Sequence, residues 1–272
     1  MNDESQGLPL GRETEYVTKY SPDILTKIDR ADQRNAIGLL ANDLPLLGED
    51  VWNCYEFSWL EPDGRPKAVI LRLLVPFDSE HMVESKSLKL YLNSFAQTEF
   101  ANEERVVNRL KSDLREACGA PVVISLLDIG GENLVETSVG DCLDHLTVRI
   151  STFKPDVTLL KSEASVGSES VFSHVFRSVC PVTGQPDHAT ISIAYEGNAI
   201  QRESLFAYLV SYREYAGFHE QVVERIYRDL MSVGSFNSLS VEGHFLRRGG
   251  IDINPFRSTH PRSRPFARVS RQ

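Results

Sequence analysis

The second half of the chain changes its hydrophobic period from that of a strand to that of a helix. Residues 190–195 alternate polar and apolar side chains, which is typical of a half-buried strand. Residues 205–212 then place Leu and Tyr at i, i+3, i+4 and i+7, the pattern of one helix face. A second helical stripe follows at 222–230.

The first half has the same order of patterns. We expect strands at 69–75 and 122–127, helices at 88–95 and 107–114, and a closing strand at 146–150, where apolar residues alternate with Thr and Arg. Strands joined by a tight turn run antiparallel, and two successive helices can cover one face of their sheet. The predicted fold class is therefore α+β.

Three sequence landmarks recur in the same order along the chain. They are Leu88–Phe95 with Leu205–Tyr212 (Leu-x-x-Tyr-Leu-x-Ser-aromatic), Pro62–Pro66 with Pro181–Pro186 (a proline-flanked turn), and Phe100 with Phe218. Their offsets are nearly equal, which indicates two copies of one domain.

This repeat predicts the domain organisation. We expect an N-terminal extension at residues 1–40, a first domain at 41–160 and a second domain at 161–272. The stretch Ser162–Ser170, rich in Ser and Gly, is the expected linker or exposed loop between the copies.

Composition narrows the class of protein. With 41% hydrophobic and 25% charged residues, the 272-residue chain is an ordinary folded protein. The most apolar stretch, Ala68–Phe77, is interrupted by Arg72 and is shorter than the ~20 residues of a membrane helix. The polar start lacks the features of a signal peptide, and the four cysteines form no Cys-x-x-Cys pair. We expect a soluble, cytoplasmic protein.

The net charge of -9 hides an asymmetry. From Leu246 to Gln272 the chain has seven arginines and one acidic residue, Asp252. A basic tail on an acidic body argues against general nucleic-acid binding and for a local anionic ligand, with a solvated tail as the simpler alternative.

Polar differences between the copies mark candidate site residues, because one active site need not be kept twice. At the first helix start, copy one has Glu84-Ser85-Lys86-Ser87 where copy two has Gln201-Arg202-Glu203-Ser204. On the hairpin, Cys180 and Asp187 of copy two align with Leu60 and Lys67. At the second helix start, Phe218-His219-Glu220 aligns with Phe100-Ala101-Asn102. Each copy is expected to hold part of one composite site.

Simpler roles remain open for these residues. Glu84 and Glu220 could be first-turn carboxylates that favour a helix N-terminus, and Cys180 could be a buried apolar residue. Neither a Gly-x-Gly-x-x-Gly nor a phosphate-binding loop motif is present. Cys180 with His174 and His188 leaves zinc as a minor possibility.

Four blocks in one order resemble a known family. The run 84–91 (ESKSLKLY), Cys180 with Asp187, the run 218–221 (FHEQ) and the run 247–255 (RRGGIDINP) are similar to the NADPH-dependent 7-cyano-7-deazaguanine reductases, the nitrile reductases of queuosine biosynthesis, a tRNA modification pathway. The similarity covers about residues 42–257 and matches the family's long tandem form. One departure is His188, where an aromatic residue such as Trp is expected.

The resemblance implies a fold, a substrate and a cosubstrate. The fold would be two tandem tunnelling-fold domains, each an antiparallel sheet backed by two helices, in a homodimer with no direct nucleic-acid or membrane partner. Two NADPH molecules per turnover would reduce the nitrile of 7-cyano-7-deazaguanine to 7-aminomethyl-7-deazaguanine, with no metal.

The resemblance also implies roles for the site residues. The catalytic residues would be Cys180, which adds to the nitrile carbon and forms a thioimide, Asp187, which protonates the nitrogen, and His219. Substrate contacts would come from Glu84, Ser85, Phe218, His219 and Glu220. NADPH contacts would come from Ser85, Lys86, Arg247, Arg248 and Gly249.

Two rival functions remain at this point. One is a zinc-dependent, cyclohydrolase-like enzyme on the same fold, against which the lack of a ligand cluster counts. The other is a non-catalytic purine-binding module.

Overall fold

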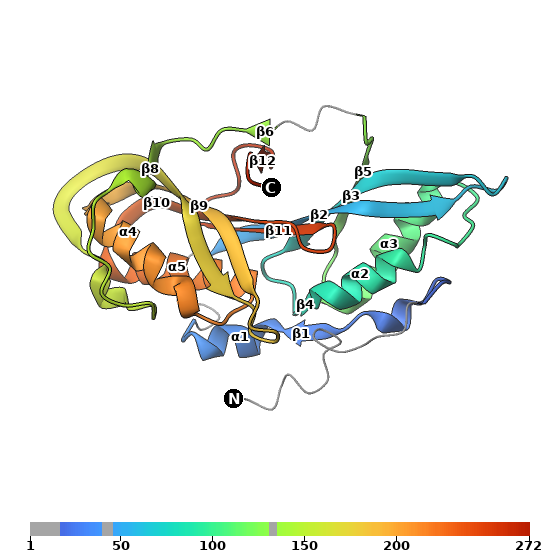
Figure 1. Cartoon of the computed structure of the whole chain (residues 1–272), viewed down its shortest axis with the longest axis horizontal. Coiled ribbons are helices and arrows are strands. Elements are labelled where there is room, and N and C mark those ends of the chain that lie inside the picture. Colours follow the sequence, from blue (N-terminus) through green and yellow to red (C-terminus); the bar gives the residue numbers. More distant parts are fainter. Residues whose placement is uncertain (1–16, 40–45, 131–134) are drawn as a thin grey trace. The chain divides into compact units, whose positions relative to one another are not determined.

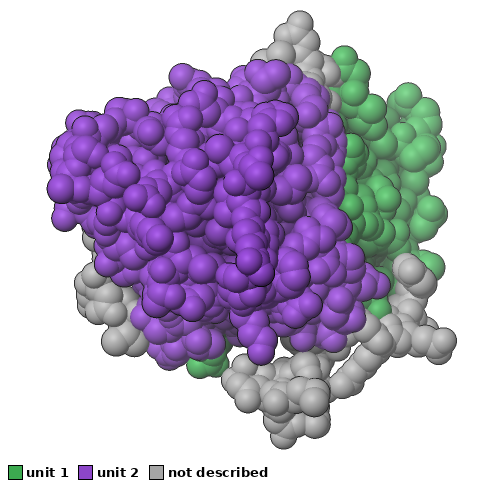
Figure 2. Space-filling view, turned by 60° about the vertical axis from the view of Figure 1, so that its left-hand side comes forward, with its two compact units in different colours: residues 1–32, 51–132, 247–252 green, residues 33–50, 133–246, 253–272 purple. Residues whose placement is uncertain are grey.

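A computed structural model describes residues 17–39, 46–130 and 135–272 of the chain. Their contacts divide the chain into two compact units, each made of three segments. Unit 1 comprises residues 1–32, 51–132 and 247–252, and unit 2 comprises 33–50, 133–246 and 253–272 (Figure 2). The expected domain boundaries after residues 40 and 160 stay a prediction. Of the expected N-terminal extension, residues 1–16 and 40 lie outside the described part.

Unit 1 combines an antiparallel sheet with two helices. Its sheet has the strand order β5-β3-β2, and a short separate pair joins β1 to β4. Helices α2 and α3 lie on one side of β3 and β5 (Figure 1). The bounds are β1 Lys27–Asp29, β2 Leu47–Leu60, β3 Pro66–Pro76, β4 His81–Val83, α2 Ser85–Asn93, α3 Glu103–Cys118 and β5 Val123–Leu127. Helix α1, Arg30–Ala36, begins in unit 1 and ends in unit 2.

Unit 2 has the same kind of architecture. Strands β11, β10, β9 and β8 are neighbours in that order, and α4 and α5 cover one face with a continuous apolar core (Figure 1). The bounds are β6 Val135–Glu136, β7 Asp141–Cys142, β8 Ser162–Val179, β9 Pro186–Ile200, α4 Arg202–Val210, α5 His219–Val233, β10 Phe236–Phe245, β11 Ile251–Ser258 and β12 Arg268–Val269. Short 3-10 turns lie at Pro22–Ile24, Leu143–His145, Val157–Leu159 and Ser211–Glu214. The α+β class is confirmed.

The hydrophobic periods predicted most elements because they report which face is buried. In α5 the five apolar residues of the predicted stripe are at most 1% exposed. In α4, Leu205, Tyr208 and Leu209 are equally buried, and Tyr212 follows in a 3-10 turn. In α3 the buried stripe begins at Val106, one residue before Val107, with which the predicted helix begins.

Two sequence expectations are wrong. Residues 146–150 form no strand, although their burial alternates as predicted, and Leu146 and Val148 pack against the unit 2 core. Alternating apolar residues indicate that one side of a segment is buried. An extended segment can bury one side without pairing its backbone with another strand. Residues 162–170 are not a linker but the exposed first half of β8, whose backbone pairs with β9 from Ser162 to Val179. Ser and Gly disfavour strands only weakly when a long partner supplies the hydrogen bonds.

Two arginines of the basic C-terminal segment form ion pairs within unit 2. Arg257 is fully buried, and its guanidinium lies 2.7 Å from Asp50 and 2.9 Å from Glu224. Arg262 contacts Glu49 at 2.6 Å and Glu242 at 2.8 Å. The anions that meet these two arginines are therefore the chain's own carboxylates, not solvent.

The two units repeat each other's side-chain contacts. In unit 1, Tyr91 donates a 2.7 Å hydrogen bond to Asp113, and in unit 2 Tyr208 donates one of 2.7 Å to Asp229. The serine hydroxyls that follow, Ser94 and Ser211, each bond the tyrosine's carbonyl at 2.6 Å. The offset of the tyrosine, 117 residues, is the one seen in the sequence.

Backbone hydrogen bonds correct the alignment at the hairpin. Leu60 and Val179 make matching bonds to the loop before the second helix, so Leu60 is equivalent to Val179. The next residue, Glu61, makes the turn bonds that Cys180 makes. Cys180 therefore corresponds to Glu61, not Leu60, because the second turn is one residue longer. Asp187 still corresponds to Lys67, since β3 and β9 begin one residue earlier, at Pro66 and Pro186.

The alignment at the second helix also shifts. The N-cap of α3 is Asn102 and that of α5 is Phe218. The pair Phe100 and Phe218 is thus not equivalent, and His219 corresponds to Glu103. Glu220 corresponds to Glu104, so a carboxylate occupies this first-turn position in both units.

Candidate active site

Cys180 lies where β8 enters the hairpin turn of unit 2. Its N–H donates to the Gln185 carbonyl at 2.8 Å, and its carbonyl accepts from Gly184 at 2.9 Å. The preceding residue, Val179, donates to Tyr215 at 2.9 Å and accepts from Gly217. These bonds fix the cysteine beside the loop that leads into α5. The Cys180 side chain is buried, with 8% of the residue exposed.

Asp187 faces the same side of the hairpin as Cys180. Asp187 is the cross-strand partner of Ser178, and Cys180 lies two residues beyond Ser178, directly after the end of β8. Paired residues, and residues two apart on one strand, share a face, so Cys180 and Asp187 are diagonal neighbours. Asp187 is 5% exposed, and its Oδ1 lies 3.4 Å from His219 Nε2.

The N-terminus of α5 supplies the remaining predicted residues of this unit. Phe218 is the N-cap, in extended conformation, and His219 and Glu220 open the helix. The His219 ring packs on Phe245 with ring centres 4.0 Å apart, which holds the imidazole beside Asp187. Glu220 is 4% exposed. The free N–H groups of a first helical turn favour negative charge there.

Glu84 caps α2 in unit 1. Its carboxylate accepts from the backbone N–H of Lys86 at 2.8 Å and of Ser87 at 2.7 Å, while Ser85 is half-buried beside it. The equivalent residue in unit 2, Gln201, makes no such side-chain bond. Glu84 is 1% exposed, and burial raises the pKa of its carboxyl although the two N–H donors act the other way. The simpler role of Glu84, as a helix cap, is thus present in the structure.

The segment before β1 holds both ends of α2, which the sequence did not indicate. The Thr26 carbonyl accepts from Glu84, and the Thr26 N–H donates to the Ser87 hydroxyl at 3.0 Å. At the other end, the Ser21 N–H donates to Ser94 at 3.2 Å and Tyr20 donates to Asp113 at 2.6 Å. Residues 20–26 therefore position the motif that begins at Glu84. In the sequence, Ser21 and Thr26 give no sign of this role, because their partners at the two ends of α2 are more than 60 residues away.

Arg247–Gly250 form the tight turn before β11 in unit 1. Arg248 and Ile251 exchange backbone hydrogen bonds of 2.8 and 3.1 Å, and Gly249 and Gly250 both have positive φ, 56° and 76°. Two positive φ angles in a two-residue turn are why both positions are glycine. Arg247 is exposed, and its guanidinium lies 4.3 Å from the Tyr55 ring centre.

A buried hydrogen-bond network surrounds Asp252, two residues after this turn. Asp252, fully buried, accepts hydrogen bonds from Tyr55 at 2.6 Å and Asn53 at 2.7 Å. Asn53 in turn accepts from Arg72 at 2.8 Å. In the sequence, Asp252 is an acid in a basic tail, and its positioning role is visible only through these contacts.

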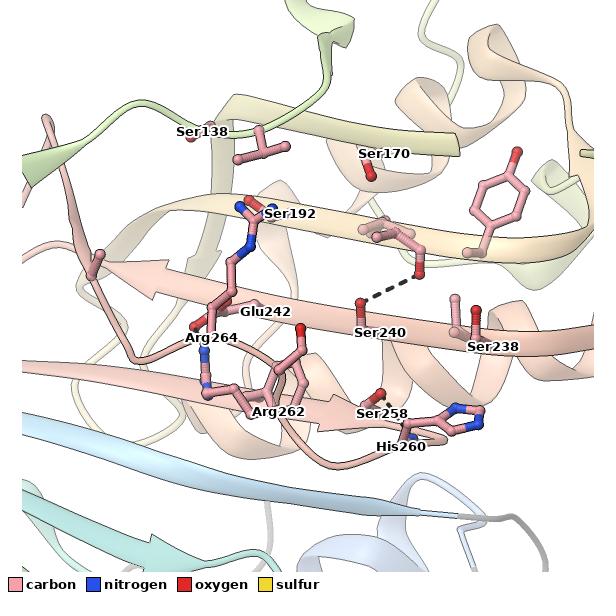
Figure 3. A pocket seen from close by; sticks show the side chains of 18 of the residues that line it. Ser138, Ser170, Ser192, Ser238, Ser240, Glu242, Ser258, His260, Arg262 and Arg264 are labelled. Carbon is pink, nitrogen blue, oxygen red and sulfur yellow. Dashed lines mark hydrogen bonds and ion pairs between the residues drawn. The ribbon is translucent and has the colours of Figure 1, made fainter. Parts of the chain in front are cut away.

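A separate cavity of about 500 Å³ in unit 2 contains none of the predicted site residues. Ser170, Ser192 and Ser240 line it from β8, β9 and β10, with Arg262 and Arg264 from the C-terminal segment (Figure 3). Its lining also includes Glu136, Glu169 and Glu242.

Within the described residues, no three His, Cys, Asp or Glu side chains are grouped to hold a metal ion. None of their helices is long and apolar enough to cross a membrane. The other cysteines of the described residues, Cys54, Cys118 and Cys142, form no disulfide, and burial raises the pKa of Cys54 strongly.

The structure thus brings one group of predicted residues together within unit 2. Asp187 and His219 are in contact, and Cys180 shares their face of the hairpin. The other predicted residues, at 84–86 and 247–249, belong to unit 1.

Comparison with known proteins assigns both halves of the chain. Residues 16–126 match the family described as nitrile reductase, 7-cyano-7-deazaguanine-reductase N-term, and residues 186–264 match QueF-like protein. Over 265 residues the chain is 43% identical to a protein named NADPH-dependent 7-cyano-7-deazaguanine reductase from Saccharophagus degradans, with 97% of this chain and 99% of the relative covered. The chain therefore belongs to the family of the 7-cyano-7-deazaguanine reductases.

Proposed function

We propose that this chain is an NADPH-dependent nitrile reductase that converts 7-cyano-7-deazaguanine to 7-aminomethyl-7-deazaguanine in queuosine biosynthesis. The observation that carries the proposal is the arrangement in unit 2. A buried cysteine, Cys180, shares a hairpin face with Asp187, and Asp187 contacts His219 at 3.4 Å. A nucleophile beside a paired acid and imidazole suits addition to a weak electrophile such as a nitrile.

Cys180 and Asp187 divide the first step between them. The thiolate sulfur of Cys180 bonds to the nitrile carbon as one π bond of the nitrile breaks. The nitrogen takes the proton of the Asp187 carboxyl, which leaves a thioimide on the enzyme and a carboxylate at Asp187. His219, held by Phe245, orients the carboxyl and lies near the reacting nitrogen.

NADPH supplies the two electron pairs of the nitrile-to-amine reduction, one from each of two molecules. Unit 1 offers groups that fit its phosphates. Arg247 is exposed, and its guanidinium lies over the ring of Tyr55. Within the described residues, no carboxylate forms an ion pair with Arg247. Arg248, Gly249, Lys86 and Ser85 complete the proposed set, since cations and backbone N–H groups bind phosphate without a Rossmann fold.

Substrate binding is proposed for Glu220, Phe218, His219, Glu84 and Ser85. A carboxylate can accept the fork of N–H donors on the pyrimidinone edge in bidentate fashion, which suits Glu220. The phenyl ring of Phe218 would pack against the bicyclic ring of 7-cyano-7-deazaguanine. Because Glu84 already caps α2, its substrate role requires its remaining lone pairs.

The proposal includes the finer architecture. Matching tyrosine–aspartate and serine contacts in the two units support tandem tunnelling-fold domains, and the family's long form supports a homodimer. No nucleic-acid partner is proposed. Four cysteines that form no disulfide support a reducing, cytoplasmic setting.

One assay tests the function directly. The protein is mixed with 7-cyano-7-deazaguanine and NADPH, and the nicotinamide absorbance is followed while product is quantified by mass spectrometry. We expect two NADPH consumed per amine formed. Binding of the nitrile without any NADPH oxidation would instead support a purine-binding module.

A further inference from the structure

The side chain of Gln221 connects the first turn of α5 to two other segments of unit 2. Its Oε1 accepts a 3.2 Å hydrogen bond from the Tyr215 hydroxyl. Its Nε2 donates to the backbone carbonyl of Gln33 at 2.9 Å and to the side-chain carbonyl of Gln33 at 3.2 Å. A backbone carbonyl can only accept, which fixes the orientation of the Gln221 amide. Gln221 is 6% exposed, so its polar atoms are buried and bonded at the same time.

Tyr215 belongs to the loop that holds the backbone next to Cys180. The Tyr215 carbonyl accepts from the Val179 N–H at 2.9 Å, and the Gly217 N–H donates to the Val179 carbonyl at 3.2 Å. This loop packs directly on the Gln221 amide. A Cβ atom at Gly217 would lie 2.7 Å from the Tyr215 ring and 2.8 Å from Gln221 Oε1, closer than packed atoms approach.

On its helix side, Gln221 directly follows His219 and Glu220. One turn later, the guanidinium of Arg225 lies 4.8 Å from the ring centre of Tyr215. Residues i and i+4 of α5 therefore hold the same tyrosine, one at its hydroxyl and one at its ring. Through Tyr215, the start of α5 is bonded to the loop that pairs with the hairpin.

In the part of unit 1 that the structure describes, the equivalent positions are not connected. Thr98 corresponds to Tyr215, because its carbonyl accepts from Leu60 in the same way. The Thr98 hydroxyl bonds a carbonyl four residues earlier in its own segment, at 2.8 Å. Gln221 corresponds to Arg105, which is exposed. The connection is thus present in the unit that holds the proposed nucleophile.

We propose that Gln221 is a positioning residue, whose amide fixes the loop beside Cys180 against the first turn of α5 and so sets where the cysteine sulfur lies relative to bound substrate. The inference rests on the proposed function, in which Cys180 attacks a nitrile that Glu220 binds. A misplacement of about 1 Å in such an alignment can lower a rate by about 100-fold. Neither Gln221 nor Tyr215 is assigned a contact with substrate.

The test measures how fast the chain gains the mass of 7-cyano-7-deazaguanine without NADPH, as a function of nitrile concentration. Tyr215→Phe removes only the hydroxyl that bonds Gln221. We expect its maximum rate of adduct formation to fall about tenfold, with the half-saturating nitrile concentration unchanged, because the sulfur is misplaced while substrate binding is not.

A double-mutant cycle shows whether the effect passes through this one bond. Gln221→Met replaces the amide with an apolar side chain of similar length, and its rate of adduct formation should fall at least as far. Adding Tyr215→Phe to Gln221→Met should lower the rate no further, since the bond is already absent.

Tyr208→Phe is the matched control. It also removes a tyrosine hydroxyl of unit 2, one that bonds Asp229 and Tyr212 instead of Gln221. We expect Tyr208→Phe to melt at a lower temperature and to keep the wild-type rate of adduct formation. An equal fall of the rate in Tyr208→Phe would show a general loss of stability and overturn the positioning role.

Hydrogen exchange gives a readout that does not depend on the chemistry. The N–H groups of Val179 and Gly217 should exchange faster in Tyr215→Phe than in wild type, by more than in Tyr208→Phe. Unchanged exchange, or a wild-type rate of adduct formation in Tyr215→Phe, overturns the proposal. If the wild-type chain forms no adduct, the proposed function fails, and the exchange rates still decide whether Gln221 holds the loop.

Discussion

His219 Nε2 lies 3.4 Å from Asp187 Oδ1, and the two equivalent positions of unit 1 hold Glu103 and Lys67, whose charged atoms are 2.9 Å apart. The surroundings differ more than the contact. The Asp187 and His219 side chains are 5% and 16% exposed, whereas those of Lys67 and Glu103 are 37% and 50% exposed. One scaffold contact is thus a surface ion pair in unit 1 and a shielded acid–imidazole pair in unit 2.

Cys180→Ala should abolish both turnover and covalent capture of the nitrile. Without NADPH, the wild-type chain should gain the mass of one 7-cyano-7-deazaguanine, because addition to the nitrile expels no leaving group. Intact mass spectrometry measures this. Cys142→Ala is the control, since Cys142 is also unpaired but lies at β7. An adduct that persists in Cys180→Ala would disprove the thioimide.

Asp187→Asn should separate chemistry from binding. The amide keeps the shape of the side chain but cannot deliver the carboxyl proton, and losing a general acid typically lowers the rate by ~10²–10⁴. Glu220→Gln should instead weaken substrate binding, because one acceptor of the N–H fork becomes a donor. Calorimetry gives the dissociation constants and steady-state assays give kcat. The opposite division of effects would reverse the two roles.

Arg247→Ala should raise KM for NADPH more than KM for NADH. A guanidinium bonded to a phosphate contributes about 1.5–3 kcal/mol, which corresponds to roughly 10–150-fold in affinity. Arg105→Ala, which removes an exposed arginine on α3, should change neither value. Equal effects of Arg247→Ala on both nucleotides would place the 2′-phosphate elsewhere.

Glu84→Gln should change how stability depends on pH. Burial raises the pKa of Glu84 in the folded state, so this group binds its proton more tightly folded than unfolded. Its contribution to stability is therefore full below the unfolded pKa of about 4.3 and is lost as pH rises through the folded value. We expect the stability difference between Glu84→Gln and wild type to become more favourable to the variant from pH 4 to pH 7.

Urea unfolding at several pH values measures this difference. The control is Glu203→Gln, which changes an exposed carboxylate in the first turn of α4. A stability difference that is flat with pH for Glu84→Gln would show that the cap bonds cancel the effect of burial.

Tyr208→Phe should destabilise the protein more than Tyr91→Phe. The Tyr208 hydroxyl bonds both Asp229 and Tyr212 in a fully buried site, so its loss should lower the free energy of unfolding by about 1.5–3 kcal/mol. Both carboxylates keep another donor, Tyr20 for Asp113 and Arg228 for Asp229. The difference comes from the buried Tyr212 hydroxyl, which loses its bond when Tyr208 is changed. Denaturant titration of both variants gives the order, and a larger loss for Tyr91→Phe would contradict it.

The sequence located the elements whose burial is periodic. The stripes of α4 and α5 and the strands at 69–75 and 190–195 follow directly from which side chains avoid water. Prediction from hydrophobic periodicity failed in the two segments where side-chain burial and backbone pairing do not coincide. Residues 146–150 bury alternate side chains without a ladder, and residues 162–170 form a ladder with little burial.

The sequence also indicated the residue types of the proposed site through short motifs: Cys180 and Asp187 on one hairpin, and His219 with Glu220 at a helix start. Only the tertiary structure decided which atoms meet. The 3.4 Å contact of His219 with Asp187 and the equivalence of Cys180 with Glu61 depend on turn lengths and strand register. A one-residue change in a turn moves every later side chain, and hydrophobic periodicity does not record it.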